Sequence, residues 1–98
     1  MDVEFVDADL ERLEFDPRYT AGYSDAVVRG FRKAMGAIRA FHDERDFYAN
    51  KGLHFEKLKG DRSHQRSVRI NKQWRLILEI DDEQKGHRIR IIGIEDYH

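Results

Sequence analysis

Three strand-like segments at the end of the chain constrain the fold more than any other feature. Residues 65–71 alternate, with Val68 and Ile70 on one side and Arg69 on the other, and a period of two is typical of a half-buried strand. Residues 74–81 are apolar at almost every position, which predicts a central strand covered on both faces. Residues 87–94 alternate again at first, and the links 72–73 and 82–86 are short. Two successive hairpins predict an antiparallel sheet.

The first half of the chain predicts helices. Apolar residues recur at steps of three and four over residues 25–42, with Ser24 as the N-cap. A short strand over residues 3–6 and a helix over residues 7–15, ended by Pro17, precede it. We expect a helical turn within residues 43–51, an extended segment over residues 53–58 and a turn at Gly60. Because the long helix and the sheet each have an apolar face, the helix should cover the sheet, giving one α+β domain over residues 1–98.

Gly30 and Gly36 lie inside the long predicted helix. Each costs up to about 1 kcal/mol relative to alanine. The sequence leaves open whether the helix approaches another element closely there or simply tolerates the two residues.

Several classes of protein do not fit the composition. The chain has no cysteine, so we expect neither disulfides nor thiolate chemistry. It has no apolar run of the ~18 residues that span a bilayer, and its acidic N-terminus lacks a signal-peptide pattern. We therefore expect a cytoplasmic protein without membrane association. The five histidines show no metal-ligand spacing, so we expect neither a metal nor another cofactor.

Charge is strongly segregated although the net charge is only -1. Residues 1–25 carry eight acids and two bases, whereas residues 26–75 carry thirteen bases and five acids. Most of the basic residues in the second group lie in residues 57–75, which hold a single acid, Asp61. This clustering is compatible with a local anion-binding site and equally with a solvated basic surface.

The chain ends in Asp96, Tyr97 and His98, directly after the third predicted strand. If that strand pairs with the second, these residues lie near residues 72–75. An imidazole can exchange a proton at neutral pH, and nearby cations such as Arg69, Arg75 and Lys59 can hold a phosphate. Together they meet the needs of metal-free RNA cleavage through the ribose 2′-OH.

Less specific interpretations remain open for the same residues. His98 is then a solvated tail, and Arg69 and Arg75 form cross-strand ion pairs with Glu79 or Asp81. Trp74 is then part of the core or its rim. A binding module without catalysis also fits the residues.

Three segments of the sequence resemble one known family. LHFEKLKGDR, RSVRINKQWRLILEI and RIIGIEDYH are similar to the HigB-like toxins of bacterial type II toxin–antitoxin modules, within the RelE/ParE superfamily. The resemblance covers residues 53–98, and the first half matches in layout only. It implies a compact RelE-like α+β fold, with a twisted antiparallel sheet packed by two N-terminal helices.

The resemblance also implies a function. It implies a toxin that cuts mRNA on the ribosome and inhibits translation. Its partner would be a HigA-type helix-turn-helix antitoxin, through which alone it would meet operator DNA. Carried over by position, the catalytic residues are His98, Tyr97, Asp96, Arg69, Lys59 and His54. Residues expected to contact the substrate are Lys57, Arg62, Arg66, Arg75 and Trp74.

One site position departs from the family pattern. Some relatives carry a histidine two residues before the Leu-Lys-Gly step, where this chain has Glu56. His54 lies two residues further upstream. A shift of two residues in an extended segment keeps the same face, so we expect either His54 or Glu56 to take part.

Two alternatives to the nuclease stay open. One is a toxin of the ParE type that inhibits a protein target such as gyrase without catalysis. The other is an inactive relative that only binds an antitoxin. Neither needs the terminal Asp96, Tyr97 and His98.

Overall fold

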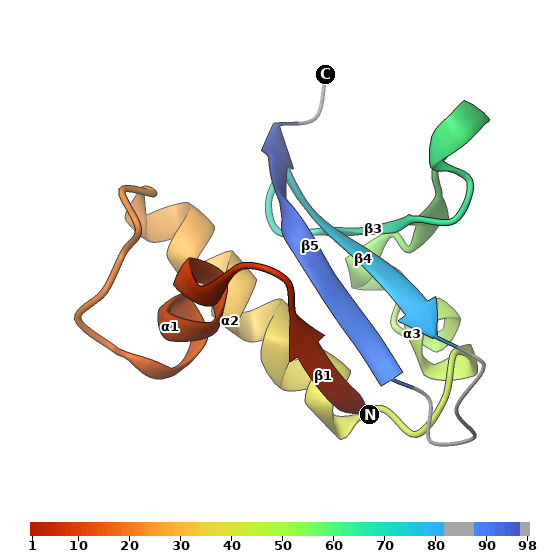
Figure 1. Cartoon of the computed structure of the whole chain (residues 1–98), viewed down its shortest axis with the longest axis horizontal. Coiled ribbons are helices and arrows are strands. Elements are labelled where there is room, and N and C mark those ends of the chain that lie inside the picture. The colour runs from red at the N-terminus through yellow and green to blue at the C-terminus, as the bar shows by residue number, and fades with distance from the viewer. Residues whose placement is uncertain (82–87, 97–98) are drawn as a thin grey trace.

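A computed structural model describes residues 1–81 and 88–96 and shows a mixed five-stranded sheet with helices on one face (Figure 1). The expected link 82–86, the start of the third predicted strand at His87, and Tyr97 and His98 lie outside the described residues. The sheet order is β1-β5-β4-β3-β2. The strands are β1 (Asp2–Phe5), β2 (Glu56–Lys57), β3 (Arg66–Arg69), β4 (Trp74–Asp81) and β5 (Arg88–Asp96). The helices are α1 (Ala8–Phe15), α2 (Asp25–Ala40) and α3 (Arg45–Ala49), with the 3-10 turns η1 (Lys51–Leu53) and η2 (Gly60–Arg62).

The second predicted strand, now β4, is central, as expected. Strands β2, β3, β4 and β5 pair antiparallel in sequence order. Strand β1 departs from the antiparallel prediction, because it pairs parallel with β5 at the sheet edge. Parallel neighbours need a long connection, and the whole chain between β1 and β5 supplies it.

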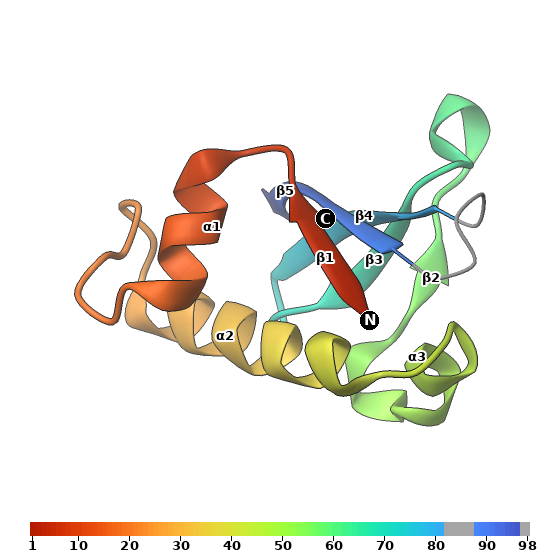
Figure 2. The same ribbon diagram turned by 60° about the horizontal axis from the view of Figure 1, so that its bottom comes forward.

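Helices α1 and α2 begin at the capping residues that the sequence predicts, and α2 ends at Ala40, two residues before the predicted end. The Asp7 carboxylate accepts a hydrogen bond from the Asp9 N–H at the start of α1, and Asp16 ends this helix before Pro17. The Ser24 hydroxyl accepts from the Val27 N–H at the start of α2. Figure 2 shows α2 lying across one face of the sheet. Its core residues Phe31, Met35 and Ile38 are fully buried, together with Leu76, Leu78, Ile89 and Ile91 of β4 and β5.

The two helical glycines differ in their surroundings. A Cβ at Gly30 would lie 2.4 Å from the Ile70 carbonyl oxygen and 2.5 Å from its Cγ2, whereas a Cβ at Gly36 would meet nothing within 4 Å. Gly30 therefore marks a close approach between α2 and the end of β3. Gly36 is merely tolerated.

The segment expected to be extended, residues 53–58, is not extended at its first two residues. Leu53 ends the 3-10 turn η1, and His54 adopts left-handed backbone angles, φ 46 and ψ 53. Only Glu56 and Lys57 form a strand. The turn signal of residues 50–52 thus reaches two residues further than predicted.

Candidate functional site

Three adjacent strands set charged side chains side by side at one end of the sheet. Arg69 of β3 lies opposite Arg75 of β4, and Arg75 lies opposite Glu95 of β5. Residues paired across antiparallel strands point to the same face. The row therefore lies on the sheet face opposite α2, which we call the outer face. Asp96, paired with Trp74, is the next residue towards the chain end.

His54 lies at the β3 end of this row, beside Arg69. Its Nε2 lies 3.4 Å from Arg69 Nη1, and its carbonyl oxygen accepts from Arg75 Nη1 at 3.2 Å. The left-handed backbone at His54 thus turns both its ring and its carbonyl towards the two arginines, although the extended geometry assumed from the sequence is wrong.

Arg75 is the buried member of this group. It is 8% exposed, and its Nη2 lies 3.9 Å from the Glu56 carboxylate. Some relatives have a histidine at the position of Glu56, and His54 and Glu56 were the two candidates to replace it. Both lie in this group of residues: His54 beside Arg69, and Glu56 beside Arg75. A buried guanidinium held in this way offers a fixed positive charge.

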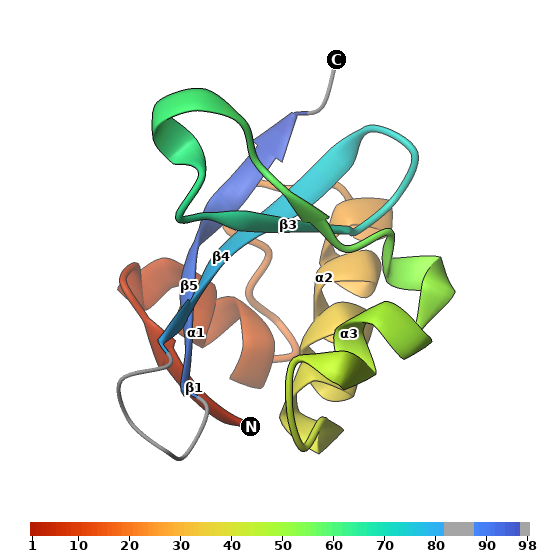
Figure 3. The ribbon, with the colours of Figure 1, turned by 90° about the vertical axis from the view of Figure 1, so that its right-hand side faces the viewer.

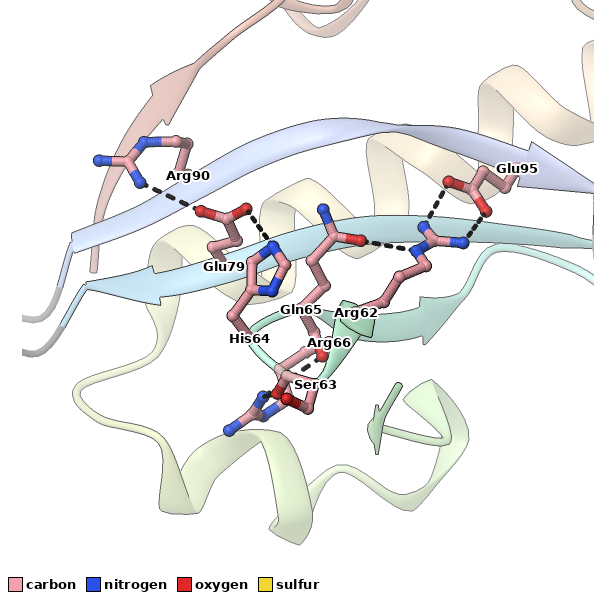
Figure 4. Close-up of polar contacts among 8 residues, drawn as sticks. All are labelled: Arg62, Ser63, His64, Gln65, Arg66, Glu79, Arg90 and Glu95. Atoms are coloured by element: carbon pink, nitrogen blue, oxygen red, sulfur yellow. Dashed lines mark hydrogen bonds and ion pairs between the residues drawn. The ribbon is translucent and has the colours of Figure 1, made fainter. Parts of the chain in front are cut away.

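A loop around η2 covers part of the outer face (Figure 3). Arg62 binds the Glu95 carboxylate through two hydrogen bonds, of 2.6 and 3.0 Å, and its Nε donates to Gln65 at 2.9 Å (Figure 4). The hydrogen bonds to Glu95 raise the pKa of the Arg62 guanidinium above its ordinary range. Nearer the other end of β4, His64 Nε2 lies 3.7 Å from Glu79, which also pairs with Arg90 at 3.2 Å. These contacts hold the loop over β4 and β5.

Other predicted site residues are dispersed. Arg66 pairs with Leu78 and with Lys57, so Arg66 and Lys57 point away from the outer face, and Arg66 Nη1 donates to the Ser63 carbonyl. Trp74 is partly buried against the core, with its ring centroid 6.0 Å from that of Tyr23. Strand pleating sends these side chains to the face opposite Arg69 and Arg75.

Lys59 is exposed and immediately precedes η2. Glu79 and Asp81, considered as partners of Arg69 and Arg75, instead lie within 3.2 and 3.9 Å of Arg90.

Sequence reasoning missed two residues of the outer face. Glu95 holds the loop through Arg62, and Ser67 is a buried polar residue, 1% exposed. Ser67 pairs with Ile77, and the strand period shared by Ser67 and Arg69 was the signal that placed both on one face. The pairing of Arg62 with Glu95 spans a loop and had no such signal.

Over residues 1–81 and 88–96, no group of three or more His, Cys, Asp or Glu side chains could hold a metal ion. What the described site offers is fixed positive charge, carboxylates and one imidazole.

A family model matches most of the sequence. The model describes the RelE-like toxin of the type II toxin–antitoxin system HigB and matches residues 3–88. The chain belongs to this HigB-like toxin family. It is therefore a toxin of the type II toxin–antitoxin class, as the resemblance implied. The match includes the N-terminal half, where the sequence had shown likeness in layout only, and it ends before Asp96.

Solved structures with the same fold are distant in sequence from this HigB-like chain. The YoeB/ParE toxin from Agrobacterium tumefaciens is 18% identical, with a TM-score of 0.60 and 100% of each chain covered. The YoeB-YefM complex from Staphylococcus aureus matches at 22% identity and a TM-score of 0.57, over 100% of this chain and 97% of that chain. The Helicobacter pylori protein HP0894 matches at 14% identity and a TM-score of 0.55, over 98% and 93%. These likenesses show the RelE-like fold.

No curated protein matches the chain. Among the described residues, none of the helices has the length and apolar character needed to span a membrane.

Proposed function

We propose that this HigB-like toxin is an endoribonuclease that cuts mRNA on the ribosome without a metal ion and so inhibits translation. The observation that carries the proposal is the end of the sheet, where His54 lies 3.4 Å from Arg69, Arg75 lies in the next strand, and β5 ends in Asp96. The RelE-like family supports the same reaction class.

The reaction assigns one task to each group. A base removes the proton of the ribose 2′-OH, and the 2′ oxygen attacks the neighbouring phosphorus. Arg69 and Lys59 stabilise the negative charge of the pentacoordinate phosphorus, and the buried Arg75 supports them. An acid then protonates the departing 5′ oxygen, leaving a 2′,3′-cyclic phosphate. His98 is the proposed acid or base, with His54 as the second proton-transfer group, and Tyr97 orients the substrate beside Asp96.

The proposal includes partners. The toxin acts on mRNA held by the ribosome in the cytoplasm, and a HigA-type helix-turn-helix antitoxin neutralises it. Operator DNA is reached only through this antitoxin, and no membrane is involved. One of the solved relatives is the YoeB-YefM complex, which makes a protein antitoxin plausible for this fold. Among site residues, Lys57, Arg62, Arg66 and Trp74 receive at most peripheral roles.

Removal of the terminal histidine tests the proposal. We expect His98→Ala, and deletion of His98, to abolish growth inhibition when the chain is produced without an antitoxin. Purified, folded variants should fail to cut mRNA on programmed ribosomes. His42→Ala is the matched control, because His42 is an exposed histidine in the link between α2 and α3, and it should retain both activities.

The alternatives give different outcomes. A ParE-like inhibitor of gyrase would stay toxic after truncation at Asp96 and would change DNA supercoiling. An inactive antitoxin-binding relative would not be toxic even unmodified. Full toxicity of both His98 variants would contradict the proposed endoribonuclease activity.

A further inference from the structure

A small cavity lies on the outer face, under the loop that contains η2. Its volume is about 170 Å³, well below the ~300–1,000 Å³ of a site for a drug-sized ligand. The floor is formed by Ser67, Arg75 and Ile77, which are at most 8% exposed, and Leu58 forms one wall. Arg62 and Glu95, joined by their ion pair, lie at the mouth.

The floor contains a polar group that lacks a protein partner. The Ser67 Oγ is buried and has no hydrogen-bond partner among the described residues. A buried hydroxyl without a hydrogen-bond partner is unfavourable. A polar ligand atom inside the cavity would supply the missing partner. Arg75, 10% exposed in its side chain, lies beside Ser67 on the same face and supplies donors at the same depth. Two buried donors on one floor indicate a ligand with acceptor atoms on its edge.

The charges around the cavity do not favour a phosphate. Arg62 is paired with the Glu95 carboxylate, and Arg75 Nη2 lies 3.9 Å from the Glu56 carboxylate. The walls contributed by Leu58 and Ile77 are apolar. A flat, neutral ligand with acceptors and donors on one side fits this lining better than an anion does. Nucleobases have this character, and RNA-binding proteins read them by stacking on side chains and by hydrogen bonds to their edges.

We infer that this cavity binds one nucleobase of the RNA, and that guanine suits it best. Guanine O6 and N7 are the acceptors that arginine binds as a pair, here from Arg75 with the Ser67 hydroxyl. Its N1–H and exocyclic amino group are donors for the Glu95 carboxylate at the mouth. This inference deepens the proposed function, on which it rests for the nature of the substrate. The mouth of the cavity adjoins Asp96, so the base would belong to a nucleotide next to the cleaved bond.

Binding of free nucleotides tests the cavity without any cleavage step. We expect guanosine 5′-monophosphate, added to the purified protein, to shift the backbone amide NMR signals of Ser67, Arg75 and Ile77. Adenosine, cytidine and uridine 5′-monophosphates should bind more weakly. Ser67→Ala should weaken guanosine monophosphate binding by about three- to tenfold, the effect of one hydrogen bond. Its melting temperature without ligand should stay the same or rise, because the lost hydroxyl has no protein partner.

Ser63→Ala is the matched control, since Ser63 is exposed on the same loop, and it should bind like the unmodified protein. Equal binding of all four nucleotides, shifts confined to other residues, or unchanged binding by Ser67→Ala would overturn the inference and leave a cavity for water only. Cleavage assays separate the two proposals. Guanosine monophosphate binding without mRNA cleavage refutes only the nuclease, and cleavage without such binding refutes only the base site.

Discussion

At the scale of single residues, Gly30 sets how closely α2 approaches the sheet. A Cβ there would lie 2.4 Å from the Ile70 carbonyl oxygen, so Gly30→Ala must push α2 and the end of β3 apart. We expect a loss of about 1–3 kcal/mol in the free energy of unfolding, as for other overpacked cores. Chemical denaturation measures it.

Gly36 is the matched control for this prediction. It lies in the same helix, and an added Cβ would meet nothing within 4 Å. Gly36→Ala should therefore stabilise the protein by up to about 1 kcal/mol, because alanine favours the helix more than glycine does. Similar effects of the two substitutions would contradict the proposed close approach.

Asp16 gives a residue-level prediction about pH. Its carboxylate accepts a hydrogen bond from the Arg18 N–H at 3.0 Å and one from Arg12 Nε at 3.3 Å. The Arg18 N–H is the larger cause of a pKa below the ordinary 3.8. A lowered pKa stabilises the fold above the unfolded value, and this stability is lost as pH falls through the folded value. Asp16→Asn should therefore be less stable than the unmodified protein near neutral pH, and the difference should vanish in acid.

An NMR titration identifies the cause of the low Asp16 pKa. In Arg12→Gln the pKa of Asp16 should remain below 3.8, because the Arg18 N–H is still present. An ordinary pKa in this variant would show that the Arg12 side chain is the main cause.

At the scale of elements, the ion pair of Arg62 with Glu95 attaches the η2 loop to β5. Both side chains are more than 40% exposed, so the pair contributes at most ~1 kcal/mol to global stability. Its effect should be local. Glu95→Gln and Arg62→Gln should each accelerate amide hydrogen exchange over residues 60–65 while leaving exchange in β4 unchanged.

Exchanging the two residues is the control for this prediction. The double variant Arg62→Glu with Glu95→Arg keeps an ion pair and should restore much of the protection. Asp61→Asn, a neutralised acid in the same turn, should change little. Unaltered exchange in both single variants would mean that other contacts, such as those of Gln65 and His64, suffice to hold the loop.

The elements also show what the sequence can predict. Helix α2 and strand β4 were predictable because periodicity and a capping serine are local signals. The direction of β1 was not, because an alternating pattern is the same in parallel and antiparallel strands. For the site, strand period correctly placed Arg69 and Arg75 together. Arg66 and Trp74 were wrongly expected beside them. Their side chains point to the other face, because strand pleating and not charge decides the direction of a side chain.

At the scale of the whole molecule, the segregated charges lie at opposite edges of the sheet. The acidic N-terminal segment forms β1, at one edge, and α1, which packs beside β1 and α2. The basic segment forms β2 and β3 at the other edge. A nearly neutral chain can therefore present one positive edge to the proposed RNA substrate while its acidic edge points away.

This arrangement predicts which charges govern binding to RNA. Each phosphate neutralised by a cation releases counterions, so affinity falls with salt in proportion to the number of contacts. Lys59→Gln and Arg69→Gln should each reduce the slope of log K against log salt by about 0.7, as expected for single-stranded RNA. Fluorescence anisotropy with a short single-stranded RNA measures the slope. Glu11→Gln neutralises an exposed acid on α1. It changes the net charge by one unit in the opposite direction and should leave the slope unaltered. If Glu11→Gln changed the slope as much as the other two variants do, net charge rather than the basic edge would control binding.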